Sequence, residues 1–169
     1  LMVAGAKIDR KKNIHLLMEA VNQLDGVRLI VFGNVLDDIK NEFERQISPK
    51  VSWIGFIDSD RAYDFFLSAD LVVFPGQHSV FWEQACACKV PCLFARWPGM
   101  EHVNNGGNSE FIDDISVEGI REKISELKFT PKYEEMKLLA ESSSTDIYLY
   151  SKIAEKSLET VLRCNDNAN

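Results

Sequence analysis

Hydrophobic residues follow two different spacings along this chain. Short unbroken apolar runs, such as VRLIVFG at residues 27–33, are typical of strands that are buried on both faces. Between these runs, apolar residues recur every three or four positions, as at Ile14, Leu17, Met18 and Val21, which gives a helix one apolar face. Because the strand and helix patterns alternate, the chain is predicted to fold as an α/β protein with a parallel sheet.

The same pattern locates the individual elements. Strands are predicted at residues 1–5, 27–33, 51–56, 71–74, 92–95 and 110–112. Helices are predicted within residues 14–24, 36–47, 58–69, 79–88 and 117–127. The expected architecture is a Rossmann-like doubly wound parallel sheet of about six strands, with helices on both faces and C-terminal helices in addition.

After Pro131 the pattern is helical only. Residues 1–169 are therefore expected to form a single domain, in which residues 130–164 are a C-terminal helical extension. The last helix carries Tyr148 and Tyr150, which we expect to be exposed and to pack on a missing part of the protein. The chain begins at Leu1, without an initiator methionine and inside an apolar run, so we expect it to be a piece of a longer protein.

Composition excludes several classes of protein. The chain is 46% hydrophobic and 27% charged, which suits a folded domain and not a disordered or fibrous one. No apolar run approaches the roughly 18 residues that a membrane helix needs. The formal net charge of −7 argues against nucleic-acid binding, because nucleic-acid-binding proteins normally carry a positive excess.

The four cysteines predict neither zinc nor disulfides. Cys86, Cys88 and Cys92 cluster, but their spacing is not a common zinc pattern, and Cys164 lies far away in sequence. We interpret them as small buried side chains of a protein in a reducing compartment.

In open parallel sheets, ligands bind beyond the carboxyl ends of the strands. Function is therefore expected in the loops at residues 6–12, 33–35, 57–59, 75–79 and 96–108. The first of these loops holds four cations, Lys7, Arg10, Lys11 and Lys12, after a glycine. They suit a phosphate or diphosphate, although a solvated basic turn is an equally good interpretation of the charge alone.

The fourth loop, Pro75-Gly76-Gln77-His78-Ser79, leads into a predicted helix. Backbone amides at a helix start can bind an anion, and Ser79 either caps the helix or contacts a phosphate. His78 is either a ligand contact or a simple loop residue. Glu83 lies one turn further on in an apolar run, where a ribose diol or an internal ion pair would satisfy its carboxylate.

The glycine-rich loop at residues 96–108 permits close backbone approach, but it is weak evidence for any one ligand. The chain has neither GxGxxG after the first strand nor GxxxxGK[ST].

Four segments in order resemble the C-terminal, donor-binding half of the GT-B glycosyltransferases of family 4, the "group 1" enzymes. They are Gly5-Ala6-Lys7-Ile8-Asp9 with the following 12–17, Val51 to Ile57, Ser68 to Pro75, and Glu83 to Pro91. The last segment is similar to the family's Glu-Ala-Met-Ala-Cys-Gly-Val-Pro, and it is the most specific of the four.

This resemblance implies roles for individual residues. Lys7 and Lys12 stand where the family binds the diphosphate, with Gly5 at the end of the preceding strand. Glu83 stands at the second glutamate of the family's E-x7-E element, which holds the ribose hydroxyls. Ser79 and Val80 stand where backbone amides meet the phosphates, in the loop of Gly76 and His78. Ile57 lies where the nucleobase is gripped.

The chain departs from the family pattern at three positions. Pro75 replaces the first glutamate of E-x7-E, Lys7 replaces an arginine, and Lys89 replaces a glycine. These departures bear on the donor sugar and on retention of anomeric configuration.

The resemblance implies a metal-independent, retaining hexosyltransferase that moves a sugar from a nucleoside-diphosphate donor to a glycan or lipid-linked acceptor. It needs no cofactor, and its acceptor-binding N-terminal domain is missing from this chain, so we expect the isolated chain to turn over little or nothing. Polysaccharide biosynthesis in the cytoplasm follows from the same resemblance, with a possible peripheral membrane association of the full-length enzyme. The alternative is a non-catalytic α/β module that binds a nucleotide or a partner.

Overall fold

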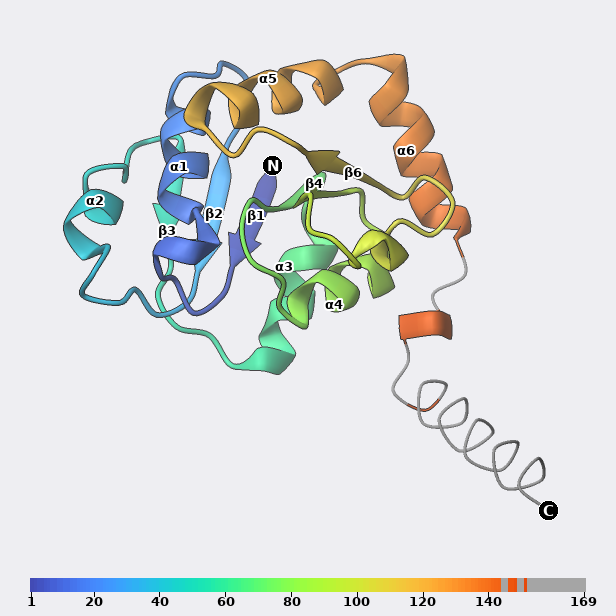
Figure 1. Ribbon diagram of the computed structural model, residues 1–169, viewed down its shortest axis with the longest axis horizontal. Coiled ribbons are helices and arrows are strands. Elements are labelled where there is room, and N and C mark those ends of the chain that lie inside the picture. Colours follow the sequence, from blue (N-terminus) through green and yellow to red (C-terminus); the bar gives the residue numbers. More distant parts are fainter. Residues whose placement is uncertain (144–145, 149–150, 152–169) are drawn as a thin grey trace.

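The computed structural model describes residues 1–143, 146–148 and 151. Its strands form one six-stranded, entirely parallel sheet in the order β3-β2-β1-β4-β5-β6 (Figure 1). The strands are β1 (Met2–Gly5), β2 (Leu29–Phe32), β3 (Val51–Trp53), β4 (Leu71–Phe74), β5 (Cys92–Ala95) and β6 (Ser109–Ile112). The doubly wound parallel sheet predicted from the sequence is thus confirmed.

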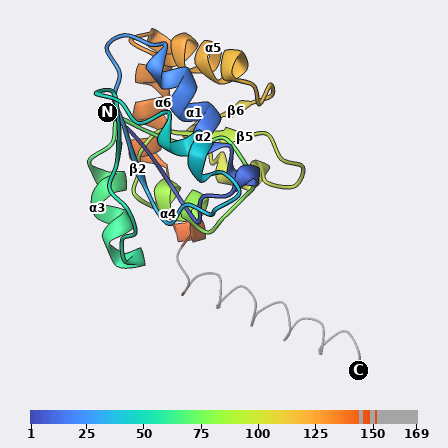
Figure 2. The ribbon, with the colours of Figure 1, turned by 90° about the vertical axis from the view of Figure 1, so that its left-hand side faces the viewer.

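Helices cover both faces of the sheet. Figures 1 and 2 show α1 and α5 on one side and α3 and α4 on the other. The helices are α1 (Ile14–Asn22), α2 (Lys40–Glu44), α3 (Ala62–Leu67), α4 (Phe81–Ala87), α5 (Val117–Leu127) and α6 (Pro131–Ser142). Short 3-10 turns are η1 (Arg10–Lys12), η2 (Ser59–Arg61), η3 (Glu101–Val103) and η4 (Asp146–Tyr148).

The sheet separates two hydrophobic cores, because successive side chains of a strand point to opposite faces. In β4, Val73 faces the core beneath α1 and α5, whereas Val72 faces the core beneath α3 and α4. All four residues of β4 are buried, which explains why the strand reads as an unbroken apolar run and not as an alternating one.

The strand order reverses between β1 and β4, the two central strands. Beyond the carboxyl ends of such a pair the loops diverge to opposite faces and leave a crevice. The loops after β1 and β4 are therefore neighbours in space, although more than sixty residues separate them in sequence. This topology places the two segments with the most chemistry, residues 6–12 and 75–79, side by side.

Two predicted elements end earlier than their apolar pattern suggested. The strand predicted over residues 51–56 ends at Trp53, since Gly55 has a left-handed backbone (φ +76°) and Phe56 is 65% exposed. The helix predicted over residues 36–47 is limited to α2, and Ile47, expected on its apolar face, is exposed. A backbone bridge between Ser48 and Val51 ends the helical stretch.

The predicted helix at residues 58–69 is divided into η2 and α3. The helix predicted to begin at Ser79 begins at Phe81, and its N-terminal cap is Val80 without a side-chain hydrogen bond. Ser79 therefore does not cap α4, contrary to one of the two roles expected for it.

The C-terminal extension is helical as far as it is described. Thr130 caps α6 by accepting a hydrogen bond from the Tyr133 amide, and Pro131 occupies the first turn of the helix. Tyr148 was expected to be exposed and is instead buried, with its hydroxyl donating to the carbonyl of Val103 at 3.0 Å. Tyr150 and most of the predicted last helix lie outside the described residues.

Candidate functional site

Lys12 joins the loops that follow β1 and β4. Its amide is held by the Asp9 side chain at the start of η1. Its ammonium reaches across the crevice and donates to the carbonyls of Gln77 (2.7 Å) and His78 (2.9 Å). Burial lowers the pKa of Lys12, although Asp9 opposes this shift. Because the Lys12 ammonium is half-buried and hydrogen-bonded only to neutral carbonyls, an anion would be a stronger partner for it.

The two loops also touch through their backbones. A Cβ on Gly76 would lie 2.4 Å from the carbonyl oxygen of Lys11, so only glycine fits at this crossing. The Gln77 amide donates to the same carbonyl at 3.0 Å, and the Asn13 side chain donates to the carbonyl of Pro75 at 3.1 Å. The loop after β4 is therefore fastened to η1, and Gly76 serves this contact.

Glu83 projects from the first turn of α4 and receives hydrogen bonds from two imidazoles. His78 Nε2 lies 2.8 and 3.0 Å from the two carboxylate oxygens. His102 Nε2, from η3 after β5, lies 3.0 Å from Oε1. Glu83 has 21% of its side chain exposed, so the carboxylate remains accessible to a ligand.

A buried aromatic stack supports this cluster from below. Trp82 is fully buried and lies 4.5 Å from the Phe94 ring, nearly parallel to it. The His78 ring meets Trp82 edge to face at 5.2 Å between centroids. Aromatic contacts of this kind fix ring orientation, so His78 is aimed at Glu83 by packing as well as by hydrogen bonding.

Ser79 and Val80 lie between the lysine and the carboxylate. The Ser79 hydroxyl oxygen is buried and has no hydrogen-bond partner in the described part of the chain. A buried polar atom without a partner costs free energy, and functional sites commonly keep such atoms for a ligand. Val80 is 49% exposed beside it.

The remaining predicted residues are distributed differently. Gly5 is buried, and a Cβ there would lie 2.4 Å from the Phe32 ring, so the structure gives it a packing role. Lys7 is exposed and makes no ion pair within the described residues. Ile57 is half-buried against the core beneath α3 and α4. Lys12 and Glu83 thus both form hydrogen bonds with the loop after β4. No hydrogen bond or ion pair joins Lys7 to that loop within the described residues.

Arg10 does not belong to the expected cluster of four cations. Its guanidinium binds Glu42 of α2 through two hydrogen bonds of 2.8 and 3.1 Å. The hydrogen bond from Arg10 lowers the pKa of Glu42. The sequence showed the charges of residues 7–12 but could not show that Arg10 turns toward α2.

His102 is the site residue that the sequence interpretation missed. The only signal was its location in the long loop after β5, at the carboxyl edge of the sheet. Nothing in the local pattern distinguished His102 from the other polar residues of that loop.

No group of three metal-ligating side chains is placed to hold an ion within the residues that the structure describes. Asp58 and Asp60 have the spacing of a carboxylate pair, but both are exposed around η2. Cys86, Cys88 and Cys92 are free thiols, and Cys86 and Cys92 are buried, as expected. Burial raises the pKa of Cys88 to about 11, which keeps this thiol protonated at neutral pH.

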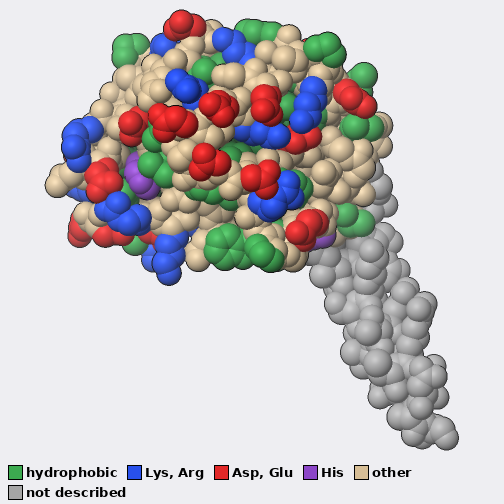
Figure 3. Space-filling view, turned by 45° about the horizontal axis from the view of Figure 1, so that its top comes forward, with side chains coloured by type: hydrophobic (Ala, Val, Ile, Leu, Met, Phe, Trp, Pro, Cys, Tyr) green, Lys and Arg blue, Asp and Glu red, His purple; other side chains and the backbone are tan. Residues whose placement is uncertain are grey.

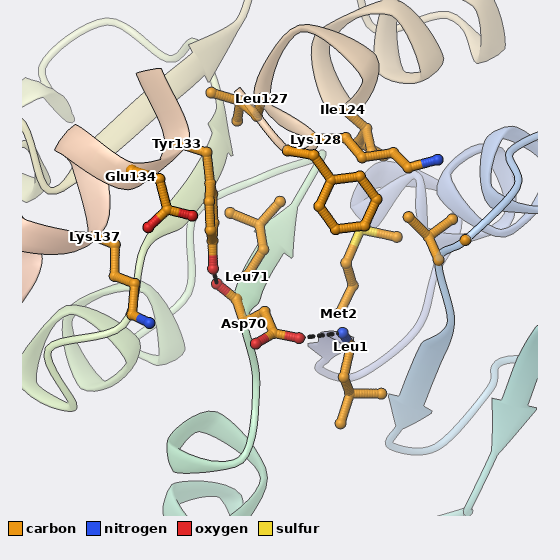
Figure 4. A pocket seen from close by; sticks show the side chains of 13 residues that line it. Leu1, Met2, Asp70, Leu71, Ile124, Leu127, Lys128, Tyr133, Glu134 and Lys137 are labelled. Carbon is orange, nitrogen blue, oxygen red and sulfur yellow. Dashed lines mark hydrogen bonds and ion pairs between the residues drawn. The ribbon is translucent and has the colours of Figure 1, made fainter. Parts of the chain in front are cut away.

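A separate cavity of about 300 Å³ lies at the opposite, amino end of the sheet (Figure 4). Its lining is mainly apolar, with Leu71, Ile124 and Leu127 among the residues that form it. The Tyr133 hydroxyl donates to the Asp70 carbonyl at 2.9 Å at its edge.

Charges are mixed on the surface. Over the face that Figure 3 presents, acidic and basic side chains are interspersed and form no large basic patch. None of the described helices combines the length and the apolar character that crossing a bilayer would require.

Comparison with known proteins agrees with this architecture. The family model described as "Glycosyl transferases group 1" matches residues 1–141. No curated protein matches the sequence.

Solved structures resemble the chain at low sequence identity. HepE from Anabaena, crystallised with UDP and glucose, is 20% identical with a TM-score of 0.71, and the match covers 94% of this chain and 48% of that one. Sucrose-phosphate synthase from Thermosynechococcus elongatus is 15% identical with a TM-score of 0.74, covering 99% of this chain and 46% of the other.

The catalytic domain of cholesterol-alpha-glucosyltransferase from Helicobacter pylori is 17% identical with a TM-score of 0.65, and the match covers 92% of this chain and 98% of that domain. The chain spans about half the length of HepE and of the synthase.

Proposed function

The chain belongs to the group 1 glycosyl transferases, and on that premise we propose that it binds a nucleoside-diphosphate sugar as the donor half of a two-domain sugar transferase. The proposal rests on one observation: Lys12 and Glu83 both form hydrogen bonds with the loop after β4, beyond the carboxyl ends of β1 and β4. A cation and a carboxylate that both contact this loop suit the two ends of a nucleoside diphosphate, its phosphates and its ribose.

Each residue has a distinct task in the proposal. The Lys12 ammonium exchanges the carbonyls of Gln77 and His78 for phosphate oxygens, which form stronger, charge-assisted hydrogen bonds. The Ser79 hydroxyl, unpartnered in the described residues, and the adjacent backbone at Val80 receive the diphosphate. Glu83 accepts hydrogen bonds from the ribose hydroxyls.

The remaining predicted residues lie at the edge of the proposed site or act through packing. Lys7 contributes charge from the exposed rim, and Ile57 offers an apolar edge for the base. Gly5 and Gly76 act through the close backbone packing described above and not through side-chain contacts.

Catalysis in this proposal is electrostatic. Negative charge grows on the diphosphate as the bond to the sugar breaks, and Lys12 stabilises that charge more in the transition state than in the ground state. We therefore propose transfer without a metal ion, by a hexosyltransferase that retains anomeric configuration. We propose that the acceptor, a glycan or a lipid-linked acceptor, binds an N-terminal domain that is not part of this chain.

The similar structures support the donor class. HepE was crystallised with UDP and glucose and with UDP-glucose. We propose the same class of donor for this chain, in a cytoplasmic enzyme of polysaccharide synthesis whose full-length form associates peripherally with a membrane.

Calorimetric titration of this chain with UDP, GDP and ADP tests the proposal. We expect one of them to bind and to lose most of its affinity in Lys12→Ala and in Glu83→Ala. Lys128→Ala, at the opposite end of the sheet, is the matched control and should bind as the parent does. Absence of binding by all three nucleotides would refute the proposal.

A second candidate function is a non-catalytic nucleotide-binding module. It is favoured by Pro75, which replaces the first glutamate of the family's E-x7-E element and removes one carboxylate from the sugar site. A full-length protein that binds a nucleotide sugar tightly, but neither transfers nor hydrolyses the sugar, would establish this alternative.

A further inference from the structure

His102 and His78 approach the same carboxylate from two different loops. An ionised carboxylate only accepts hydrogen bonds, so the Nε2 atom of each ring carries the donated proton. His78 bridges both oxygens of Glu83 at 2.8 and 3.0 Å, and His102 binds Oε1 at 3.0 Å. The two rings are 6.5 Å apart and inclined by 64°, so they hold the carboxylate from different directions.

The turn that carries His102 is fixed independently of Glu83. The buried carbonyl of Val103 accepts hydrogen bonds from the Asn108 side chain (3.0 Å), the Tyr148 hydroxyl (3.0 Å) and the Cys86 thiol (3.4 Å). Asn108 is itself 1% exposed. The turn is thus anchored to the core from below, and it presents His102 at a defined position.

The His102 side chain is about half exposed. Ion pairs and hydrogen bonds at such positions contribute little to stability, about 0–1 kcal/mol. The contact between His102 and Glu83 therefore adds little to the stability of the fold. We attribute the anchoring of the turn to the orientation that His102 gives to the Glu83 carboxylate.

The remaining acceptor capacity of Glu83 matches a diol. A carboxylate accepts about four hydrogen bonds. The two imidazole protons use about two of them, which leaves about two on a carboxylate whose rotation is fixed. A vicinal pair of hydroxyls offers two donors.

We propose that His102 is a positioning residue that orients Glu83 toward the 2′- and 3′-hydroxyls of a ribose, so that the site selects ribonucleotides over 2′-deoxyribonucleotides. This inference rests on the proposed function, because it assumes that Glu83 faces the ribose of a bound nucleotide. His102 itself does not touch the sugar; it acts through the carboxylate.

The experiment compares UDP with 2′-deoxy-UDP by calorimetry, or the corresponding pair for GDP or ADP if that nucleotide binds best. The parent chain is expected to prefer the ribonucleotide about tenfold or more. His102→Leu should reduce that preference to about threefold or less, mainly by weakening the ribonucleotide. One well-oriented hydrogen bond to the 2′-hydroxyl, about 1.4 kcal/mol, corresponds to the tenfold preference expected of the parent chain.

Two further variants separate positioning from general damage. His102→Gln keeps an N–H donor near the place of Nε2 and is expected to restore most of the preference. Glu101→Gln, in the same turn, is the matched control and should leave the preference unchanged. A turn that merely stabilised the fold would weaken both nucleotides equally in His102→Leu.

The outcomes are distinguishable. If none of the ribonucleotides binds the parent chain, the proposed function fails and this inference fails with it. If a ribonucleotide binds but the parent shows no preference, or if His102→Leu keeps the full preference, only the inference is overturned. Tighter ribonucleotide binding by His102→Leu would show that the imidazole competes with ribose, which also overturns it.

Discussion

The two ends of the sheet differ in how their polar groups are satisfied. At the amino end, the cavity of about 300 Å³ is lined mainly by apolar side chains, and the Tyr133 hydroxyl at its edge donates to the Asp70 carbonyl (Figure 4). At the carboxyl end, the Ser79 hydroxyl is buried and unpartnered in the described residues, and the Lys12 ammonium has only neutral partners.

This difference shows that a hollow alone does not indicate a functional site. A mainly apolar cavity with few convergent polar groups offers little specificity for a ligand. Unmet hydrogen-bonding capacity costs free energy in the free protein, and a ligand that satisfies it recovers that cost. The unmet hydrogen-bonding groups therefore favour ligand binding at the carboxyl end, where the sheet topology also opens a crevice.

The sharpest test of this comparison exchanges one lysine at each end for methionine. Lys12→Met should weaken nucleoside-diphosphate binding by about 30-fold, since one charge-assisted hydrogen bond contributes about 2 kcal/mol. Lys128→Met, beside the amino-end cavity, should leave binding unchanged. Calorimetry measures both, and equal losses would contradict the assignment of function to the carboxyl end.

A smaller effect is expected from Gly76→Ala. The added Cβ would collide with the Lys11 carbonyl at 2.4 Å and push the loop after β4 away from η1. We expect the free energy of unfolding to fall by about 1–3 kcal/mol and nucleotide affinity to fall several-fold.

The control for that variant is Gly99→Ala, where no atom lies within 4 Å of the added Cβ and only the left-handed backbone (φ +82°) is strained. This control should lose about 1 kcal/mol in urea unfolding and keep its nucleotide affinity. Unchanged binding by Gly76→Ala would show that the contact between the loops does not shape the site.

At the amino end, Tyr133→Phe removes the hydroxyl that donates to the Asp70 carbonyl. The free energy of unfolding should decrease by about 0.5–1 kcal/mol, the worth of one partly exposed hydrogen bond. Nucleotide affinity should not change. A loss of nucleotide binding in this variant would show that the amino end of the sheet affects the site, and it would contradict the separation of the two ends.

The smallest effect concerns pH. Burial lowers the pKa of Lys12 below its ordinary 10.5, so the ammonium loses its proton at a lower pH than an exposed lysine does. Diphosphate affinity should therefore decline as the pH is raised from 8 toward 10.5. Lys12→Arg keeps its charge throughout this range and should flatten the decline. Identical alkaline profiles would show that Lys12 does not bind the diphosphate.

Local patterns predicted the central strands well because burial on both faces leaves an unbroken apolar run in β1, β4 and β5. β4 and β5 were predicted at their observed bounds, since all their residues are apolar or small and buried. Predicted boundaries were wrong where a single backbone conformation decided them, as at Gly55. They were also wrong where a residue of a capping type does not cap the helix, as at Ser79.

The sequence by itself determined the alternation of elements, the parallel sheet and the polar loops at its carboxyl edge, because these follow from periodicity and from residue types that act over a few neighbours. Only the tertiary structure decided which charges meet: Arg10 turns to Glu42, Lys12 reaches the loop after β4, and His102 reaches Glu83. These contacts join residues that are distant in sequence, and their geometry depends on how the strands are ordered and how the loops pack. No local pattern contains that information.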